Sequence, residues 1–168
     1  MSLRLATISD LPAIMEITNT AVALLNAEGN FQWNDKYPIE SDFTNDIKDE
    51  TLWVALVDDA VAGFAALTTD QPDEYKNVGW DVTQVSIVPH RLAVSPNFRG
   101  KGIAQALMSQ AEELARLKGY REVRVDTNSI NAAMNGVFKK MGYQFAGTTG
   151  LPGKPADMVF NCYNKIIA

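Results

Sequence analysis

The sequence is poor in the residues that build metal sites and covalent cross-links. Its 168 residues include one cysteine, Cys162, and one histidine, His90. A single cysteine excludes an internal disulfide, and one cysteine with one histidine cannot supply the four ligands of the usual protein zinc site. We therefore expect no structural metal. Cys162 falls in the alternation of a predicted last strand, where we expect a buried apolar residue and not a nucleophile.

Long apolar runs are also scarce. By inspection, no stretch approaches the roughly 20 apolar residues of a membrane span. Asp10 interrupts the region in which a secretory leader would have its apolar core. We therefore expect a cytoplasmic protein with no membrane partner. The length fits a single domain, residues 1–168, that buries close to about 70% of its unfolded surface.

Positive charge is scarce in the first half of the chain. Residues 1–84 carry 4 Lys and Arg against 15 Asp and Glu, whereas residues 85–168 carry 11 against 5. The net charge of −5 argues against a nucleic acid partner, because duplex binding needs a continuous basic face. The asymmetry indicates different partners for the two halves, with ordinary solvated surface charge as the alternative.

The most informative segment is His90–Ala104, in which an apolar run leads into a glycine turn and then a helical pattern. Gly100 and Gly102 allow tight backbone dihedrals, and the first amides of a helix have no intrahelical partner. The helix dipole also favours an anion at such a turn. We therefore predict that this turn binds phosphate.

Hydrophobic periodicity predicts strands and helices along the whole chain. Asp58-Asp59 between two apolar runs predicts a hairpin, and Pro89 inside a strand predicts a bulge that opens a slot before the turn. We expect an α/β fold of the α+β type, with a mixed, mainly antiparallel sheet of about seven strands flanked by about four helices. The predicted strands are 3–6, 52–57, 61–67, 82–94 with an interruption at Pro89, 122–126, 143–146 and 158–166, and the predicted helices are 11–27, 40–49, 103–118 and 130–141.

This chain resembles the GNAT superfamily of acyl-CoA-dependent N-acetyltransferases over nearly its whole length. Arg99-Gly100-Lys101-Gly102-Ile103-Ala104 fits the family's Arg/Gln-x-x-Gly-x-Gly/Ala signature, and Leu92-Ala93-Val94 and Asn131–Tyr143 are similar to its flanking segments. The resemblance implies an enzyme that uses acetyl-CoA as co-substrate and a primary amine as acceptor. It implies that the amides of residues 99–104 hold the CoA pyrophosphate, and that the backbone of Leu92, Ala93 and Val94 pairs with the pantetheine arm.

Two further positions follow from the resemblance. Asn131 is similar in placement to residues that touch the CoA arm, with a helix cap as the alternative role. Phe138 stands where many relatives have a tyrosine that often protonates the leaving thiolate, and a phenylalanine has no proton to donate. The resemblance places Phe138 near the CoA arm and leaves the thiolate proton to another group or to water.

His90 is the candidate general base. An alkyl ammonium with a pKa of about 10 is almost fully protonated at pH 7, and only the neutral amine attacks a thioester. Strand alternation places His90 on the same side as Leu92 and Val94, and the ordinary pKa of an imidazole suits a base. A histidine simply packed beside Pro89 is the alternative.

The acidic first half suits a cationic acceptor. Carboxylates among Glu40, Asp42, Glu74 and Asp81 would attract an amine. Trp33 and Tyr37, in an irregular loop, would add a cation–π wall or anchor that loop on the core. A small molecule or a peptide would supply the amine, and a homodimer is common in the family.

Two other functions stay open at this point. A CoA-binding sensor or partner-binding domain that has lost its acid would also explain Phe138. A Rossmann-type nucleotide-binding domain would also place Gly100 and Gly102 between a strand and a helix, with Asp126 at the end of the next strand. Against the second, Gln105 occupies the third glycine position and about ninety residues precede the turn.

Overall fold

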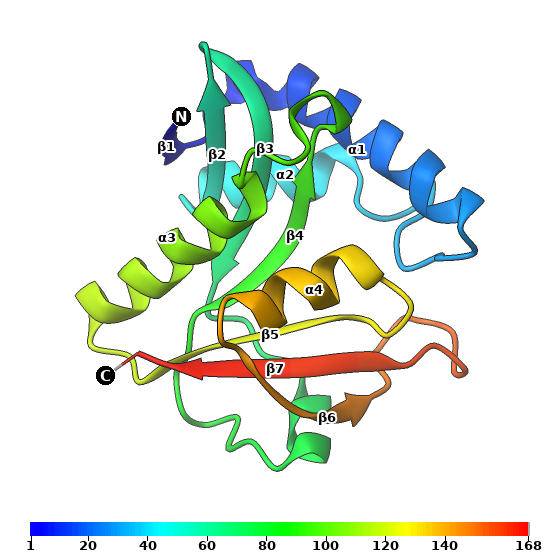
Figure 1. The fold of residues 1–168 in the computed structure, drawn as a ribbon, viewed down its shortest axis with the longest axis vertical. Helices are drawn as coiled ribbons and strands as arrows, with labels where there is room; N and C mark the ends of the chain where they lie inside the picture. The colour runs from blue at the N-terminus through cyan, green and yellow to red at the C-terminus, as the bar shows by residue number, and fades with distance from the viewer. Residues whose placement is uncertain (168) are drawn as a thin grey trace. The chain divides into compact units, whose positions relative to one another are not determined.

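The computed structural model describes residues 1–167. Within them, seven strands and four α-helices follow one another in the predicted order, with three 3-10 helices between them (Figure 1). The helices are α1 (Leu11–Ala27), α2 (Glu40–Lys48), α3 (Ile103–Lys118) and α4 (Ala132–Lys140), with the 3-10 helices η1 (Ile8–Asp10), η2 (Asp73–Val78) and η3 (Pro96–Phe98). The strands are β1 (Ser2–Leu5), β2 (Leu52–Val57), β3 (Ala60–Thr68), β4 (Val88–Val94), β5 (Glu122–Asn128), β6 (Gln144–Thr149) and β7 (Phe160–Ile166).

The chain forms two compact units. Unit 1 comprises residues 1–67 and 90–109, and unit 2 comprises residues 68–89 and the chain from 110 onward. β4 and α3 each contribute residues to both units. The single domain over residues 1–168 therefore stays a prediction.

A four-stranded sheet in the order β1-β2-β3-β4 organises unit 1. The predicted hairpin is confirmed, because Val57 pairs with Ala60 across Asp58 and Asp59. Both aspartates have positive φ, 49° and 63°. A two-residue loop of this kind matches the twist of the two strands that it joins.

Gly63 marks a close approach of backbones in this sheet. It lies opposite Ala55, where the register of β2 against β3 shifts by a bulge. A Cβ atom at Gly63 would lie 2.8 Å from the Ala93 carbonyl oxygen and 2.8 Å from the Ile103 side chain. Only glycine therefore fits at this position, which allows β3 to pack closely against β4 and the start of α3.

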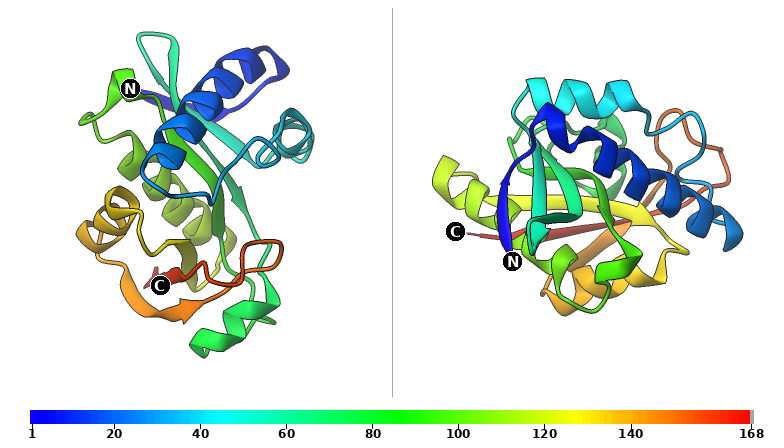
Figure 2. Two further views of the ribbon diagram at one scale, coloured as in Figure 1. Left: turned by 90° about the vertical axis from the view of Figure 1, so that its right-hand side faces the viewer. Right: turned by 90° about the horizontal axis from the view of Figure 1, so that it is seen from above.

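Helices α1 and α2 lie on the same side of β1, β2 and β3 (Figure 2). Their inward residues Ile14, Ile17 and Phe43 join a core with side chains from the sheet. The Phe43 and Phe64 rings meet edge to face at 5.2 Å between centroids, a favoured aromatic geometry. These apolar contacts hold α1 and α2 against the sheet.

The expectation that no stretch of the chain resembles a membrane span was wrong. Residues Ile8–Ala27 form a helical segment that is long and apolar enough to cross a membrane by length and composition alone. This segment has a high mean hydropathy because it contains many apolar and small side chains and only two charged ones, Asp10 and Glu16. Leu11, Ile14 and Ile17 lie in the core of unit 1, and a core helix of a folded domain meets the same criterion.

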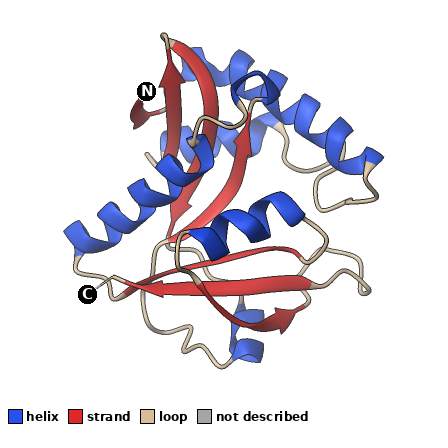
Figure 3. Cartoon of the chain, in the orientation of Figure 1, coloured by secondary structure: helices blue, strands red, loops and turns tan. Residues whose placement is uncertain are grey.

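A three-stranded antiparallel sheet in the order β5-β7-β6 forms unit 2, together with α4 and η2 (Figure 3). The strand predicted over residues 82–94 is confirmed only in its second part, since β4 begins at Val88 and continues through Pro89 to Val94. Asp81 accepts hydrogen bonds from both the amide and the hydroxyl of Thr83, which holds these residues in a turn. One isolated bridge, between Ile87 and Val123, is parallel.

Candidate functional site

Most of the residues predicted to bind the cofactor lie in unit 1, on β4 and the turn that follows it. After η3, Gly100 and Gly102 adopt positive φ values of 75° and 74°, and α3 begins at Ile103. Glycine is the residue that takes these angles without strain. A Cβ atom added at either glycine would meet nothing within 4 Å, so the outer side of the turn is open.

The start of α3 is suited to an anion. Ala106 donates to the Gly102 carbonyl at 3.0 Å, so the amides of Ile103, Ala104 and Gln105 precede the regular helical ladder. No acidic side chain lies in the first turn of this 16-residue helix. Arg99 and Lys101 beside it are exposed cations. Helix dipole, amides and side chains therefore all favour negative charge at the turn.

β4 is the last strand of its four-stranded sheet, so in that sheet one edge of its backbone has no ladder partner. Ala93 is buried in the core of unit 1, whereas Leu92 and Val94 are only partly buried. Alternation along a strand places these two on the opposite side from Ala93. An extended chain bearing amide groups fits such an edge by strand addition.

The irregularity predicted at Pro89 lies two residues further along, at Arg91, which has a φ of 50°. Arg91 donates to both carboxylate oxygens of Asp46 on α2, at 2.7 Å each, and to the Tyr37 hydroxyl at 3.1 Å. The Arg91 and Asp46 side chains are 15% and 10% exposed. His90, which is half-buried, directly precedes this left-handed residue.

Two aromatic residues of the loop before α2 make contacts within unit 1. Trp33 is buried in the core, and Tyr37 binds Arg91, so the loop is anchored by its aromatics. Of the carboxylates expected to attract an amine, Asp42 caps α2 through the Ile39 amide and Asp81 closes the turn with Thr83. Both therefore serve local structure.

A cavity of about 380 Å³ opens between α1 and the loop that leads into α2. Its lining combines apolar side chains with amides and two carboxylates, and Glu40 is the one residue there that the sequence predicted. The lining residues are Met15, Asn19, Val22, Asn34, Asp35, Pro38, Ile39 and Glu40. Within residues 1–167, no group of three or more His, Cys, Asp and Glu side chains is placed to hold a metal ion.

Comparison with known proteins agrees with this arrangement of strand, turn and helix. The model of the acetyltransferase (GNAT) family matches residues 18–143. The chain belongs to the GNAT family. A solved GNAT acetyltransferase from Streptococcus agalactiae is 29% identical, with a TM-score of 0.82 over 98% of this chain and 94% of that one. The Rossmann-type alternative is therefore wrong, as the antiparallel ladders also show.

Curated relatives include the uncharacterized N-acetyltransferase YesJ of Bacillus subtilis, 29% identical over 81% of this chain and 81% of that protein. The N-acetylaspartate synthetase of Rattus norvegicus is 30% identical over 68% of this chain and 36% of that protein. The chain thus spans little more than a third of the length of this synthetase.

The two remaining GNAT-like positions lie on α4 in unit 2. Asn131 caps α4, and its side-chain oxygen accepts from the Met134 amide at 3.2 Å. This is the cap that the sequence gave as the alternative role. Phe138 is 2% exposed, with its ring centroid 5.5 Å from that of Tyr163 and 6.0 Å from that of Tyr143. Burial, and then the Glu112 carboxylate, raise the pKa of Tyr143, so its hydroxyl is a weak acid.

Proposed function

We propose that this GNAT protein transfers the acetyl group of acetyl-CoA to a primary amine by direct attack of the amine on the thioester. Members of the family use acetyl-CoA. The observation that carries the proposal is the open turn Arg99–Ala104 at the start of a 16-residue helix, directly after an edge strand. The residues present suit a ligand with a pyrophosphate at one end and an amide-bearing arm.

The amides at the start of α3 are proposed to bind the pyrophosphate oxygens, with Arg99 and Lys101 adding positive charge. Lys101 lies with its Nζ 5.5 Å from the centre of the Phe98 ring, within the range of a cation–π contact. The free edge of Leu92, Ala93 and Val94 is proposed to hydrogen-bond the pantetheine amides. These contacts orient the arm along β4 and hold the ligand without a metal.

His90 is proposed to take the proton from the ammonium form of the acceptor. Acetyl-CoA supplies the thioester carbonyl and a thiolate leaving group. A base within reach of the amine raises the fraction of neutral nucleophile, and the imidazole is suited to this at neutral pH. Phe138 has no proton to give, so we propose that water or a second group protonates the thiolate.

The acceptor is proposed to be a cationic amine, free or carried by a peptide. The first 84 residues carry 15 acidic side chains against 4 basic ones, which gives this half of the chain a negative field. Asp35 and Glu40 line the cavity beside α1, where apolar side chains also contribute. We also propose that the protein acts in the cytoplasm.

Calorimetry with acetyl-CoA and with NAD, followed by assay of CoA release, tests the proposal. The release assay uses a panel of polyamines, amino acids, aminoglycosides and peptide N-termini. We expect saturable binding of acetyl-CoA, none of NAD, and CoA release with at least one amine. Binding with no release on any amine would favour the sensor alternative, for which Phe138 is the supporting observation. Failure to bind acetyl-CoA would refute both functions.

A further inference from the structure

We propose that Arg91 is a positioning residue, which Asp46 and Tyr37 hold so that the loop before α2 sets the geometry of β4 at His90 and Leu92. This inference rests on the proposed function, because its catalytic meaning depends on His90 as the base and on Leu92 as a partner of the pantetheine arm. The contacts that carry it lie entirely in unit 1.

The backbone at Arg91 is in a conformation that its residue type disfavours. A φ of 50° brings the Cβ atom of an L-residue close to the following carbonyl oxygen, and glycine usually occupies such positions. A strained conformation persists only where surrounding interactions determine it, and such residues cluster at functional sites. Arg91 lies between the proposed base and the first residue of the proposed arm-binding edge.

The side chain of Arg91 supplies those interactions. Its Nε and Nη2 atoms pair with the two oxygens of Asp46 in the parallel geometry that gives a guanidinium its directionality. Its Nη1 atom donates to the Tyr37 hydroxyl at 3.1 Å. Three hydrogen bonds to two separate elements therefore fix both the position and the rotation of this side chain.

The fixed side chain constrains its backbone neighbours. Since a left-handed residue turns the strand, a change in φ at Arg91 redirects both the His90 side chain and the Leu92 amide and carbonyl. Tyr37 directly precedes Pro38, which lines the 380 Å³ cavity beside α1. The Tyr37 hydroxyl thereby links the loop that borders the cavity to β4.

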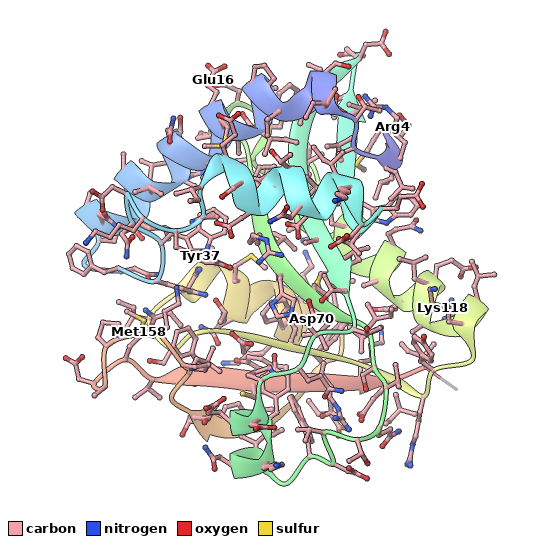
Figure 4. All side chains as sticks on the ribbon, turned by 180° about the vertical axis from the view of Figure 1, so that it is seen from behind. Arg4, Glu16, Tyr37, Asp70, Lys118 and Met158 are labelled. Carbon is pink, nitrogen blue, oxygen red and sulfur yellow. The ribbon has the colours of Figure 1, made fainter. Side chains whose placement is uncertain are left out.

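The Arg4–Asp10 pair provides a matched control. It is also a two-bond arginine–carboxylate pair of unit 1, with distances of 2.8 and 3.0 Å. Arg4 is on β1, at the far end of the strand order from β4, and Figure 4 shows it well separated from Tyr37. Asp10→Asn therefore breaks a two-bond arginine–carboxylate pair of the same unit, with a more exposed arginine, without touching β4.

The experiment uses the full chain and three variants, Asp46→Asn, Tyr37→Phe and Asp10→Asn. His90 is the only histidine, so its imidazole signals in a heteronuclear NMR spectrum are assigned without ambiguity. We expect these signals to shift in Asp46→Asn and Tyr37→Phe and to stay in place in Asp10→Asn. Calorimetry measures the dissociation constant for acetyl-CoA. We expect it to rise about tenfold in Asp46→Asn and about threefold in Tyr37→Phe, because a small displacement of the binding edge weakens several hydrogen bonds to the ligand at once.

The outcomes separate this inference from the proposed function. Unchanged His90 signals and unchanged acetyl-CoA binding in a folded Asp46→Asn or Tyr37→Phe variant would overturn the positioning role and leave the function intact. If the wild-type chain does not bind acetyl-CoA, the proposed function fails, and the NMR signals alone then decide whether Arg91 positions His90. Tyr37→Phe removes only one oxygen atom, so this variant can be used for the test if Asp46→Asn does not fold.

Discussion

Arg124 in unit 2 is buried and Arg91 in unit 1 is partly buried, and the two are held in different ways. Arg124 in unit 2 is 2% exposed and donates both bonds of its main pair to Glu122, which lies two residues earlier on the same strand. Arg91 in unit 1 bonds to Asp46 and Tyr37, which precede it by 45 and 54 residues. The first arginine thus has its main acceptor within one strand, whereas the second joins β4 to two distant segments.

The two guanidinium groups also differ in the number of their hydrogen bonds and in the backbone that carries them. Arg124 also donates to the Gln71 side chain and the Asp81 carbonyl, and it lies 5.2 Å from the centre of the Trp80 ring. Its backbone belongs to a regular antiparallel ladder. Arg91 has fewer bonds and a left-handed backbone. We infer that Arg124 stabilises unit 2, while Arg91 gives up some stability to hold a particular backbone geometry.

The largest effect should come from removing the more deeply buried arginine. Arg124→Leu leaves Glu122 buried without its partner, and such a change costs about 3–5 kcal/mol in the free energy of unfolding. Chemical denaturation measures this loss. Arg116→Ala is the control, because its pair with Glu113 is exposed and worth less than about 1 kcal/mol. A loss as small as that of the control would show that Arg124 is not a structural clamp.

Arg91→Leu should destabilise the protein less, by about 2–3 kcal/mol, measured in the same way. The Arg91–Asp46 pair is partly exposed, so water compensates some of the loss at the unpaired Asp46. The left-handed conformation is also unfavourable for leucine, and this contributes to the cost. A loss greater than that of Arg124→Leu would reverse the contrast between the two arginines.

Local signals explain why much of the fold was predictable. Apolar periodicity and turn residues predicted the element order, the hairpin at Asp58-Asp59 and the glycine turn before α3, because each depends on neighbours in the sequence. The first part of the strand expected from residue 82 failed for a local reason as well. Thr83 donates to Asp81 through both its amide and its hydroxyl, and this turn keeps the alternating residues after it out of the strand.

The site was less predictable because its key geometry depends on distant residues. Nothing in the sequence around Arg91 indicates a positive φ, since the residue is not glycine and its partners lie on α2 and in the loop before it. The burial of Arg124 also depends on distant residues, Gln71 and Asp81. Proline at position 89 did indicate an irregular strand, but not which residue would carry it.

Two glycines, one in each unit, allow the effect of close packing to be compared with the effect of helix propensity. Gly63→Ala in β3 should cost about 1–3 kcal/mol, because the added Cβ would lie 2.8 Å from a backbone oxygen of β4. Gly136→Ala in α4 should stabilise by about 0.5–1 kcal/mol, since nothing lies within 4 Å and alanine favours the helix. Thermal denaturation of both variants tests the pair, and equal effects would contradict the close approach at Gly63.

The smallest effect concerns pH and the Arg4–Asp10 pair of unit 1. The hydrogen bonds from Arg4, together with the Thr7 amide, hold the pKa of Asp10 below its ordinary value, although burial opposes this. The unfolded chain therefore takes up this proton more readily than the folded chain. The pair's stabilisation is present above the ordinary pKa of about 4 and is lost as the pH falls through the lower, folded value.

Asp10→Asn should consequently flatten the acid side of the stability curve, whereas Glu113→Gln in the exposed pair of unit 2 should leave it nearly unchanged. Denaturation midpoints between pH 6 and 3 measure both, and an equal response of the two variants would show that the Arg4–Asp10 pair contributes no more than a surface contact.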